Sequence, residues 1–471
     1  MEEGLLLVKE GEKTSEGGLI TWGVLGWEMK RLGHIAAPMV AMTVSQQLLL
    51  VGCTMMVGHL GELSLSATAI ATSLSNVIGF SILSGMVGAL DTLCGQAYGA
   101  QQYQKVGTKT YTAIVSLSVI CLPLSILWMN MGKLLISLGQ DPLISHGAGE
   151  FIKWLIPSLF ANAIYYPLVR YFLMQSLIIP MLISSCASLV FCVPLCWILV
   201  FKSGLHNLGG ALVIDISIWL NVIFLVLYMR YSSACAKTRA PISMDVLRGV
   251  GEFFRFGIPS AVMLCLEWWS FELVILLSGI LLNPQLETSV LSICFNTASI
   301  FYCVPYGLSA AISTRVSNEL GAGNPQGARV AVRAVMFLVV VEITIVSTTL
   351  FASRHILGYT FSNEKEVVDY VTSMAPLACL SVIGDGFHGV LSGIARGCGW
   401  QHLGAYVNLG AYYLVGIPIA VLLGFWVQLG GKGLWAGIIV GSISQSILLG
   451  IITGFTNWEK QVQSSSLTLS S

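Results

Sequence analysis

The sequence predicts an all-α integral membrane protein with twelve transmembrane helices, and two observations support this fold class. Only 10% of the 471 residues are charged and 55% are hydrophobic, whereas an ordinary soluble domain carries about 25% charged residues. Long charge-free windows also recur along the chain, and about 20 apolar residues cross the hydrocarbon core as a helix. The windows are continuously apolar and do not alternate with polar positions, which excludes a closed β-barrel.

The twelve windows follow one another along the whole chain. Most are free of charged residues, four are interrupted by one or two acids, and the short fourth window is extended by Lys153 and Arg170, whose long side chains reach the interface. In chain order the windows are 32–61, 63–90, 110–132, 154–169, 171–201, 203–229, 256–286, 288–314, 334–353, 370–395, 397–431 and 433–458.

Both ends of the chain are polar, and we expect them to be cytosolic tails, 1–32 and 458–471. The first tail is rich in Glu and Lys and lacks the basic start and apolar run of a secretory signal. With both tails in the cytosol, most Lys and Arg lie on the cytosolic side, as the positive-inside rule requires. The opposite side keeps only Lys133, Lys153, Lys202, Arg354, Lys365 and Lys432.

Charge, cysteine and proline content narrow the function further. The 23 basic and 23 acidic residues balance, which argues against a nucleic-acid partner because phosphate binding relies on a surplus of Lys and Arg. The 12 cysteines lie mostly in apolar windows without a CxxC pair, so we expect packing roles rather than disulfides or a metal site. Most prolines lie within spans, where each removes a backbone donor and bends a helix. The sequence therefore predicts bent spans and no metal.

The two halves of the chain are related by an internal repeat. When residues 85–104 are aligned with 307–326, six positions are identical: Gly85, Ala89, Thr92, Gly99, Ala100 and Gln104 meet Gly307, Ala311, Thr314, Gly321, Ala322 and Gln326. Pro194 and Gly209 likewise meet Pro418 and Gly433. The repeat predicts two six-span lobes, 33–231 and 251–457, joined by a cytosolic linker, 232–250. Six is even, so the pseudo-twofold axis should run along the membrane normal, as in transporters with parallel repeats.

Four long motifs fall at corresponding places in the two halves of the chain. Two lie after the first and second spans, and two lie at the corresponding places of the second lobe. They are Met55-Met-Val-Gly-His-Leu-Gly-Glu-Leu63, Ala89-Leu-Asp-Thr-Leu-Cys-Gly-Gln-Ala-Tyr-Gly-Ala100, Pro305-Tyr-Gly-Leu-Ser-Ala-Ala311 continuing into Ser313-Thr-Arg-Val-Ser-Asn-Glu-Leu-Gly-Ala-Gly-Asn-Pro325, and Ala395-Arg-Gly-Cys-Gly-Trp-Gln401. In these motifs the sequence resembles the multidrug and toxic compound extrusion (MATE) exporters in their plant, DETOXIFICATION-type form, and the resemblance covers about residues 25–457.

The resemblance implies a V-shaped pair of six-helix lobes around a central cavity that opens alternately to either side of the membrane. It also implies proton-coupled antiport of organic cations, xenobiotics or plant secondary metabolites. The expected partners are such a substrate, protons and membrane lipid, without a cofactor, and we expect a monomer in the plasma membrane or the vacuolar membrane.

Carboxylates within the spans are the candidates for ion coupling, because an unpaired ionised carboxylate costs several kcal/mol in hydrocarbon. Glu267 and Glu272 lie in the seventh span and Asp385 in the tenth. In the resembling family, acids at the places of Glu267 and Asp385 are implicated in proton coupling, so we expect these two to lie near one another. Each acid could instead be a hydrogen-bond partner that locks two helices. Glu267 and Glu272 are about 140° apart on an ideal helix, so sharing one site would require the seventh span to bend or unwind near Gly257–Pro259 or close to Glu267.

Aromatic and polar side chains near these acids suit a large flat cation, although they could equally pack in a core. The predicted cavity residues are Asn296, Tyr302, Tyr306, Trp269, His388, Gln46 and Asp215. We assign gate or structural roles to Asp91, Gly99, Arg315, Gly321 and Pro259. Two further positions remain open: Glu342 could bond a neighbouring helix, and Leu173 with Met174 could line the cavity or face lipid.

The motifs of soluble enzymes are absent: the sequence has no G-x-S-x-G, no HExxH and no phosphate-binding loop. Energy must therefore come from a gradient rather than from ATP hydrolysis by this chain. Three alternatives stay open beside the proton-coupled exporter: a sodium-coupled antiporter, a lipid-linked saccharide flippase of similar architecture, and a membrane-embedded acyltransferase built around His388.

Overall fold

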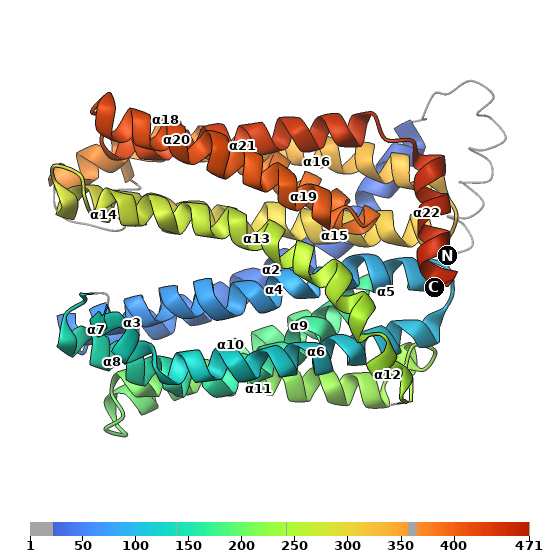
Figure 1. Ribbon diagram of the computed structural model, residues 1–471, viewed down its shortest axis with the longest axis horizontal. Coiled ribbons are helices and arrows are strands. Elements are labelled where there is room, and N and C mark those ends of the chain that lie inside the picture. The colour runs from blue at the N-terminus through green and yellow to red at the C-terminus, as the bar shows by residue number, and fades with distance from the viewer. Residues whose placement is uncertain (1–21, 138, 242, 357–364, 471) are drawn as a thin grey trace. The chain divides into compact units, whose positions relative to one another are not determined.

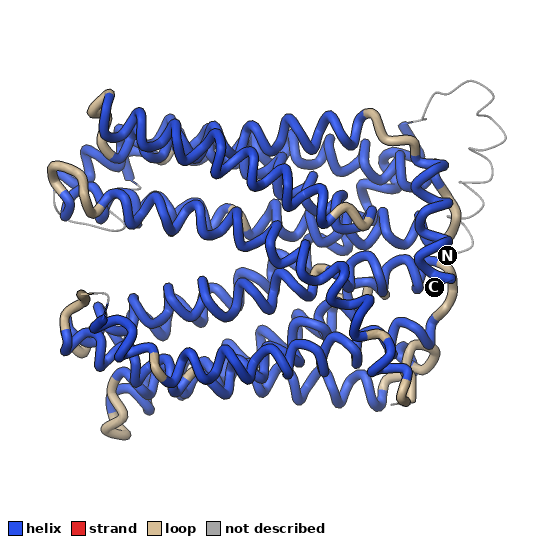
Figure 2. Tube along the Cα trace, in the orientation of Figure 1, coloured by secondary structure: helices blue, strands red, loops and turns tan. Residues whose placement is uncertain are grey.

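The computed structural model describes residues 22–137, 139–241, 243–356 and 365–470, and these residues form helices joined by short turns, with no β-strand among them (Figure 2). The predicted all-α class is therefore confirmed. In the N-terminal half the helices (Figure 1) are α2 (Trp22–Gly58), α3 (Glu62–Ser75), η1 (Asn76–Phe80), α4 (Ser81–Val87), α5 (Ala89–Gly99), α6 (Tyr103–Met129), α7 (Met131–Ser137), α8 (Pro142–Trp154), α9 (Ile156–Met174), α10 (Ile179–Phe201), α11 (Asn207–Tyr231), η2 (Ser233–Cys235) and α12 (Asp245–Arg248).

The C-terminal half continues in the same way, and each of its predicted windows again contains helix. Its helices are α13 (Val250–Ser278), α14 (Pro284–Phe301), α15 (Cys303–Gly321), α16 (Pro325–Ala352), α18 (Lys365–Cys398), α19 (Gln401–Asn408), η3 (Leu409–Gly416), α20 (Ile417–Val421), η4 (Leu422–Trp426), α21 (Gly431–Gly454) and α22 (Trp458–Ser470).

Ten helical segments of the described chain are long and apolar enough to cross a membrane, and the bent pair α14 and α15 makes an eleventh. The remaining predicted span is α9, a helix of 19 residues. It contains Asn162 and Arg170, which lower its mean hydropathy, yet both side chains are buried. All twelve predicted windows are thus helical. Helix α9 is less apolar than those ten segments, and it can contain polar residues because protein rather than lipid surrounds them.

The seventh span was predicted to bend or to unwind locally near Gly257–Pro259 or close to Glu267. It does not unwind, because α13 is one continuous α-helix with Pro259 inside it, and its bending stays a prediction. A single proline removes one backbone donor and leaves the remaining hydrogen bonds of a helix in place. The eighth span is bent by 41° where α14 meets α15.

Two spans are also irregular because they contain π-helical turns, three in all among the described residues. One such turn, η1, lies in the second span, and two, η3 and η4, lie in the eleventh. A π-turn inserts an extra residue into an α-helix and often marks a functional position. It also leaves a backbone carbonyl oxygen without its usual donor within the helix, so that a side chain of another helix can donate a hydrogen bond to it.

The described residues fold into two compact units, whose boundaries lie inside helices. The first unit contains the chain up to Val40 and from Ser270 onward, and the second contains Ala41–Trp269. Helices α2 and α13 therefore each contribute one part to each unit. The lobe boundaries predicted around the linker 232–250 stay a prediction.

Each unit has its own apolar core. In the first unit, Leu291, Trp435 and Ile438 are fully buried together with residues of α13, α14, α18 and α20. In the second unit, Cys192 and Cys196 pack with apolar residues of α2, α10 and α11. All twelve cysteines are free thiols, and those in the cores behave as small packing residues.

The backbone repeats the same local conformations in both halves, as the internal sequence repeat leads one to expect. Helices α5 and α15 end at Gly99 and Gly321, and two residues later Gln101 and Gly323 both have positive φ, at 59° and 73°. His206 and Gly430, which precede α11 and α21, match in both φ and ψ, with φ of 50° and 59°.

The glycines that follow these two residues also have matching roles. A Cβ added at Gly209 would lie 2.6 Å from the carbonyl oxygen of Leu199, and one added at Gly433 would lie 2.6 Å from that of Leu423. The relation predicted from the sequence is therefore present in the backbone. An axis along the membrane normal stays a prediction.

Candidate functional site

A buried carboxylate lies in the middle of α18. Asp385 is only 8% exposed and is surrounded by polar side chains of two helices. Ser381, one turn earlier on α18, donates a hydrogen bond to Oδ2 over 3.5 Å, and Ser442 of α21 donates to Oδ1 over 3.3 Å. Hydroxyl groups can turn to donate to a carboxylate or to accept from a carboxylic acid. These surroundings can therefore hold Asp385 with or without its proton.

His388 adds a second titratable group to this position. Its Nε2 lies 3.4 Å from Oδ1 of Asp385, one turn along the same helix. The imidazole is buried and stacks on Tyr302, which links α14 to α15, with ring centroids 5.9 Å apart and an interplanar angle of 18°. The bend of the eighth span thus places an aromatic ring against the Asp385 position.

The two side chains belong to a buried polar stripe along one face of α18. The stripe continues with Ser392, which receives a hydrogen bond from Gln445 of α21 over 3.4 Å, and Gln445 in turn accepts one from Tyr412 over 2.8 Å. At the end of the stripe, Arg396 donates to Ser309 of α15 over 2.9 Å. Residues at this spacing lie on one face of a helix, so the members of the stripe are Ser381, Asp385, His388, Ser392 and Arg396.

The remaining candidates in the first unit have different surroundings. Glu272 and Tyr306 are half-buried and Asn296 is exposed. Glu342 of α16 is 9% exposed, and within the described residues neither of its carboxylate oxygens has a hydrogen-bond partner. It faces Gly386, where an added Cβ would lie 3.4 Å from Oε2. Glu342 therefore packs against α18 without forming the helix-locking hydrogen bond considered above.

Glu267, Trp269 and Gln46 lie in the second unit. Glu267 is buried. Trp269 donates from Nε1 to the carbonyl oxygen of Val77 over 3.0 Å, which a π-turn of the second span presents. Gln46 of α2 donates to the hydroxyl of Tyr165 over 2.5 Å. Asp385 belongs to the first unit, so the expected proximity of Glu267 and Asp385 stays a prediction.

Asp215 is the other buried acid of the second unit. It lies in α11, and Ser158 at the start of α9 is beside its carboxyl group. Its Oδ1 has no hydrogen-bond partner in the described part of the chain. The carboxyl group therefore lies where α11 packs against α9 and is not fully paired there.

Leu173 and Met174 are fully buried at the end of α9. They neither line an open cavity nor face lipid, so the two alternatives left open for them are replaced by a packing role.

Two of the residues assigned to gate or structural roles, Asp91 and Arg315, form buried ion pairs. In the second unit, Nε of Arg170 lies 3.3 Å from Oδ1 of Asp91. In the first unit, Arg315 pairs with Glu28 of α2 over 2.6 Å and with Glu319, one turn later, over 2.5 Å. Each guanidinium is almost fully enclosed. A buried pair depends on both partners, because removing one leaves an uncompensated charge.

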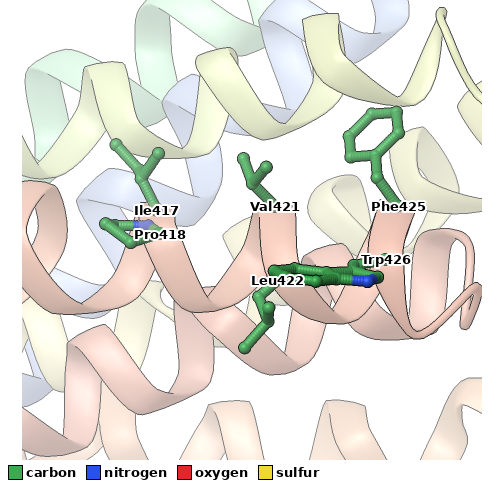
Figure 3. A pocket seen from close by; sticks show the side chains of 6 residues that line it. All are labelled: Ile417, Pro418, Val421, Leu422, Phe425 and Trp426. Carbon is green, nitrogen blue, oxygen red and sulfur yellow. The ribbon is translucent and has the colours of Figure 1, made fainter.

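A groove of about 500 Å³ in the first unit is lined by apolar side chains alone. In Figure 3 the side chains of Ile417, Val421 and Phe425 project from one side of the eleventh span. The other lining residues are Pro418, Leu422 and Trp426. The groove offers no group that could bind a proton or orient a cation, so it is not the candidate site.

The arrangement around Asp385 is suited to binding a proton or an organic cation rather than a metal ion. No three or more His, Cys, Asp and Glu side chains in the described ranges are placed so as to hold a metal. A carboxylate beside an aromatic ring can attract an organic cation, and the same carboxylate can take up a proton instead.

Sequence reasoning identified Asp385, His388 and Tyr302 but missed the groups that surround them. Ser381 and Ser392 could have been found from their spacing of four residues from Asp385 and His388 on a helix. Ser442, Gln445 and Tyr412 carry no such signal, because they reach the stripe only through the packing of α21 and η3 on α18. Glu28 was missed because it lay in the predicted tail.

Comparisons with known proteins point to one family. The family model MatE matches residues 38–198 and 259–422. Among curated relatives, Protein DETOXIFICATION 12 of Arabidopsis thaliana is 57% identical over 449 residues, covering 94% of this chain and 93% of the relative. Protein DETOXIFICATION 10 of the same plant is 55% identical over 451 residues, covering 94% of this chain and 92% of the relative.

Solved structures agree. The crystal structure of the eukaryotic MATE transporter AtDTX14 has a TM-score of 0.91 and 56% identity, and the match covers 94% of this chain and 98% of that one. An outward-facing multidrug resistance MATE family transporter has a TM-score of 0.82 at 13% identity, over 93% of this chain and 97% of the other. At 13% identity, the likeness to this second transporter shows a shared fold and nothing more.

Proposed function

This chain belongs to the MatE family of multi-pass membrane transporters, and we propose that it exports small organic cations, xenobiotics or secondary metabolites in exchange for protons. Its relatives are transporters rather than enzymes. The observation that carries the proposal is the buried Asp385, which is held by hydroxyl donors of two helices and faces an aromatic ring through His388.

The proposed exchange follows from charge. An ionised Asp385 stabilises a cation nearby, whereas a protonated Asp385 loses that attraction, so proton and substrate compete. Glu267 is the second proposed coupling residue, because it is likewise a buried carboxyl group within a span. Glu272 is half-buried and has a smaller role. Plasma membrane or vacuolar membrane, with both termini in the cytosol, is the proposed location.

Transport by the purified chain in proteoliposomes tests this function. An imposed pH gradient should drive accumulation of tetraphenylphosphonium, and Glu267→Gln and Asp385→Asn should each reduce that accumulation at least tenfold. An amide keeps the size and much of the hydrogen bonding of the acid but cannot exchange a proton. The amount of folded protein, measured by size-exclusion chromatography in detergent, should stay unchanged.

Two matched amide variants serve as controls. Glu272→Gln should have a smaller effect, and Asp215→Asn should leave the proton dependence largely intact, because Asp215 lies in the second unit and Asp385 in the first. Full coupling in both Glu267→Gln and Asp385→Asn would place the ion site elsewhere. Accumulation driven by sodium in place of protons would favour the sodium-coupled alternative, and no cation transport under either gradient would favour a flippase.

A further inference from the structure

We infer that His388 and Asp385 bind the exchanged proton as a pair, and that His388 determines the pH at which the pair becomes an anion. The inference rests on the proposed proton coupling and assigns to His388 a role distinct from lining a cavity. It is carried by the 3.4 Å separation of Nε2 and Oδ1 and by the burial of both side chains within one turn of α18.

The geometry holds the imidazole in place for this role. Tyr302 stacks on the ring from the junction of α14 and α15, with the two ring planes nearly parallel. On the other side of the pair, Ser381 and Ser442 donate to the two oxygens of Asp385. The carboxylate therefore keeps hydrogen-bond donors whether or not the imidazole bears an extra proton.

Two other ionisable groups of the described residues lie against α18 near the pair. The phenol of Tyr302, between α14 and α15, stacks on His388, and Glu342 of α16 lies against Gly386 on a different face of α18. From α21 and α15, Ser442, Gln445 and Ser309 meet the stripe, and none of them ionises. Arg396 lies two turns beyond His388 and bonds Ser309. A protonated His388 has an oxygen of Asp385 within 3.4 Å.

The pair changes charge differently from a lone carboxyl group. With one proton bound, the pair is neutral, whether the proton is on the imidazole or on the carboxyl; after losing it, the pair is anionic and can attract a cationic substrate. Histidine changes charge between about pH 5 and 8, above the usual range of a carboxyl group. Two groups this close titrate as a unit. The imidazole is therefore a second carrier of the exchanged proton beside the carboxyl group.

Binding of tetraphenylphosphonium to the purified chain in detergent, followed from pH 4 to 9, tests the inference without requiring transport. In the unmutated chain, binding should be lost between about pH 5 and 8, where histidine titrates. His388→Gln keeps a donor for Asp385 but cannot take up a proton, so the midpoint should move at least one pH unit toward acid. His388→Asn should shift it in the same direction and serves if the glutamine variant folds poorly.

His402→Gln is the matched control, since His402 is an exposed histidine of α19, and it should leave the midpoint unchanged. An unshifted midpoint in both His388 variants, or loss of binding only below pH 5 in the unmutated chain, would overturn the inference. Asp385→Asn separates the two proposals. If it binds tetraphenylphosphonium at pH 8 as tightly as the unmutated chain does, the proposed site itself is wrong; if it weakens that binding while the His388 variants do not shift the midpoint, only the inference about His388 fails.

Discussion

At the scale of single residues, the polar side chains within the spans differ in how fully they are paired. Asp385 has two hydroxyl donors and an imidazole, and Arg315 has two carboxylates. Glu342 has no hydrogen-bond partner among the described residues, although it is as deeply buried. Burial of a polar group without a hydrogen bond costs about 1–3 kcal/mol in proteins. The three positions should therefore respond differently to mutation.

Replacement of Glu342 by a residue of similar size without polar oxygens should not lower the free energy of unfolding. We expect Glu342→Met to leave the free energy of unfolding unchanged or to raise it by about 1–3 kcal/mol, because an unpaired buried carboxyl group is removed. Thermal unfolding in detergent would measure this, with Glu342→Gln as the polar control. A strongly destabilised Glu342→Met would show that the carboxyl group has a stabilising partner after all.

Loss of Arg315 should have the opposite effect. Arg315→Ala leaves Glu28 and Glu319 without their shared partner in a buried position, and breaking such a pair costs about 3–5 kcal/mol. Arg329→Ala is the control, because the pair of Arg329 with Glu459 is exposed and such pairs contribute about 0–1 kcal/mol. Equal unfolding temperatures for the two variants would contradict this assignment.

At the scale of helices, the sequence predicted where the spans lie better than it predicted their irregularities. Long apolar windows identify spans because each must be apolar along its whole length, and even α9 was found from the charges that flank it. The bend at Tyr302 and the π-turns were not predicted, since they depend on which neighbouring helix accepts or supplies a hydrogen bond. Proline content predicted bent spans in general, and Gly257 with Pro259 pointed to unwinding in α13, which is continuous.

The repeated contacts at the start of α11 and α21 allow a paired test. Gly209→Ala and Gly433→Ala each place a Cβ within 2.6 Å of backbone atoms of the preceding span, and backbone cannot move aside as a flexible side chain can. Both should lower the free energy of unfolding by about 1–3 kcal/mol, the usual cost of overpacking.

Gly410→Ala is the control for this pair, since nothing lies within 4 Å of the added Cβ. It should be neutral or slightly stabilising. If only one of the two repeat glycines tolerated alanine, their structural equivalence would be contradicted.

At the scale of the whole molecule, each compact unit takes part of one helix from the other half of the chain. In the first unit, Gly307 of α15 lies against Ala36 and Val40 of α2; in the second, Gly85 of α4 lies against Ala261 of α13. Gly85 and Gly307 are the repeat pair found in the sequence. The repeat was therefore predictable from the sequence. The exchange of helix segments was not, because sequence identity shows which residues of the two halves correspond but not whether a residue contacts its own half or the other half of the chain.

This exchange predicts that the halves do not fold alone. Residues 1–240 would carry α2 without the Glu28–Arg315 pair, and residues 241–471 would carry α13 without the Lys109–Glu252 pair. Each fragment should aggregate in detergent when expressed singly, and the two should elute as one complex when expressed together. Intact protein cleaved between 240 and 241 after folding is the control and should remain assembled. A monodisperse single fragment would rule this out.

The candidate site was predictable only in part. Asp385 and His388 stand out because charged or titratable residues are rare within apolar spans. The hydroxyls and amides that complete the stripe look like any other polar residues until α21 is packed against α18. A sequence can thus reveal where ionisable chemistry lies within a membrane, while the groups that tune it depend on tertiary packing.

The exchanged segments of α2 and α13 also bear on how such a chain could arise. A protein with a single copy of the repeat, making the same contacts, would be a domain-swapped homodimer in which each subunit lends the start of its first helix to its twin. Duplication and fusion of its gene would turn that dimer into one polypeptide without creating a new interface. After such a fusion the two copies are free to diverge, and in this chain only the second carries an aspartate and a histidine in its fourth span.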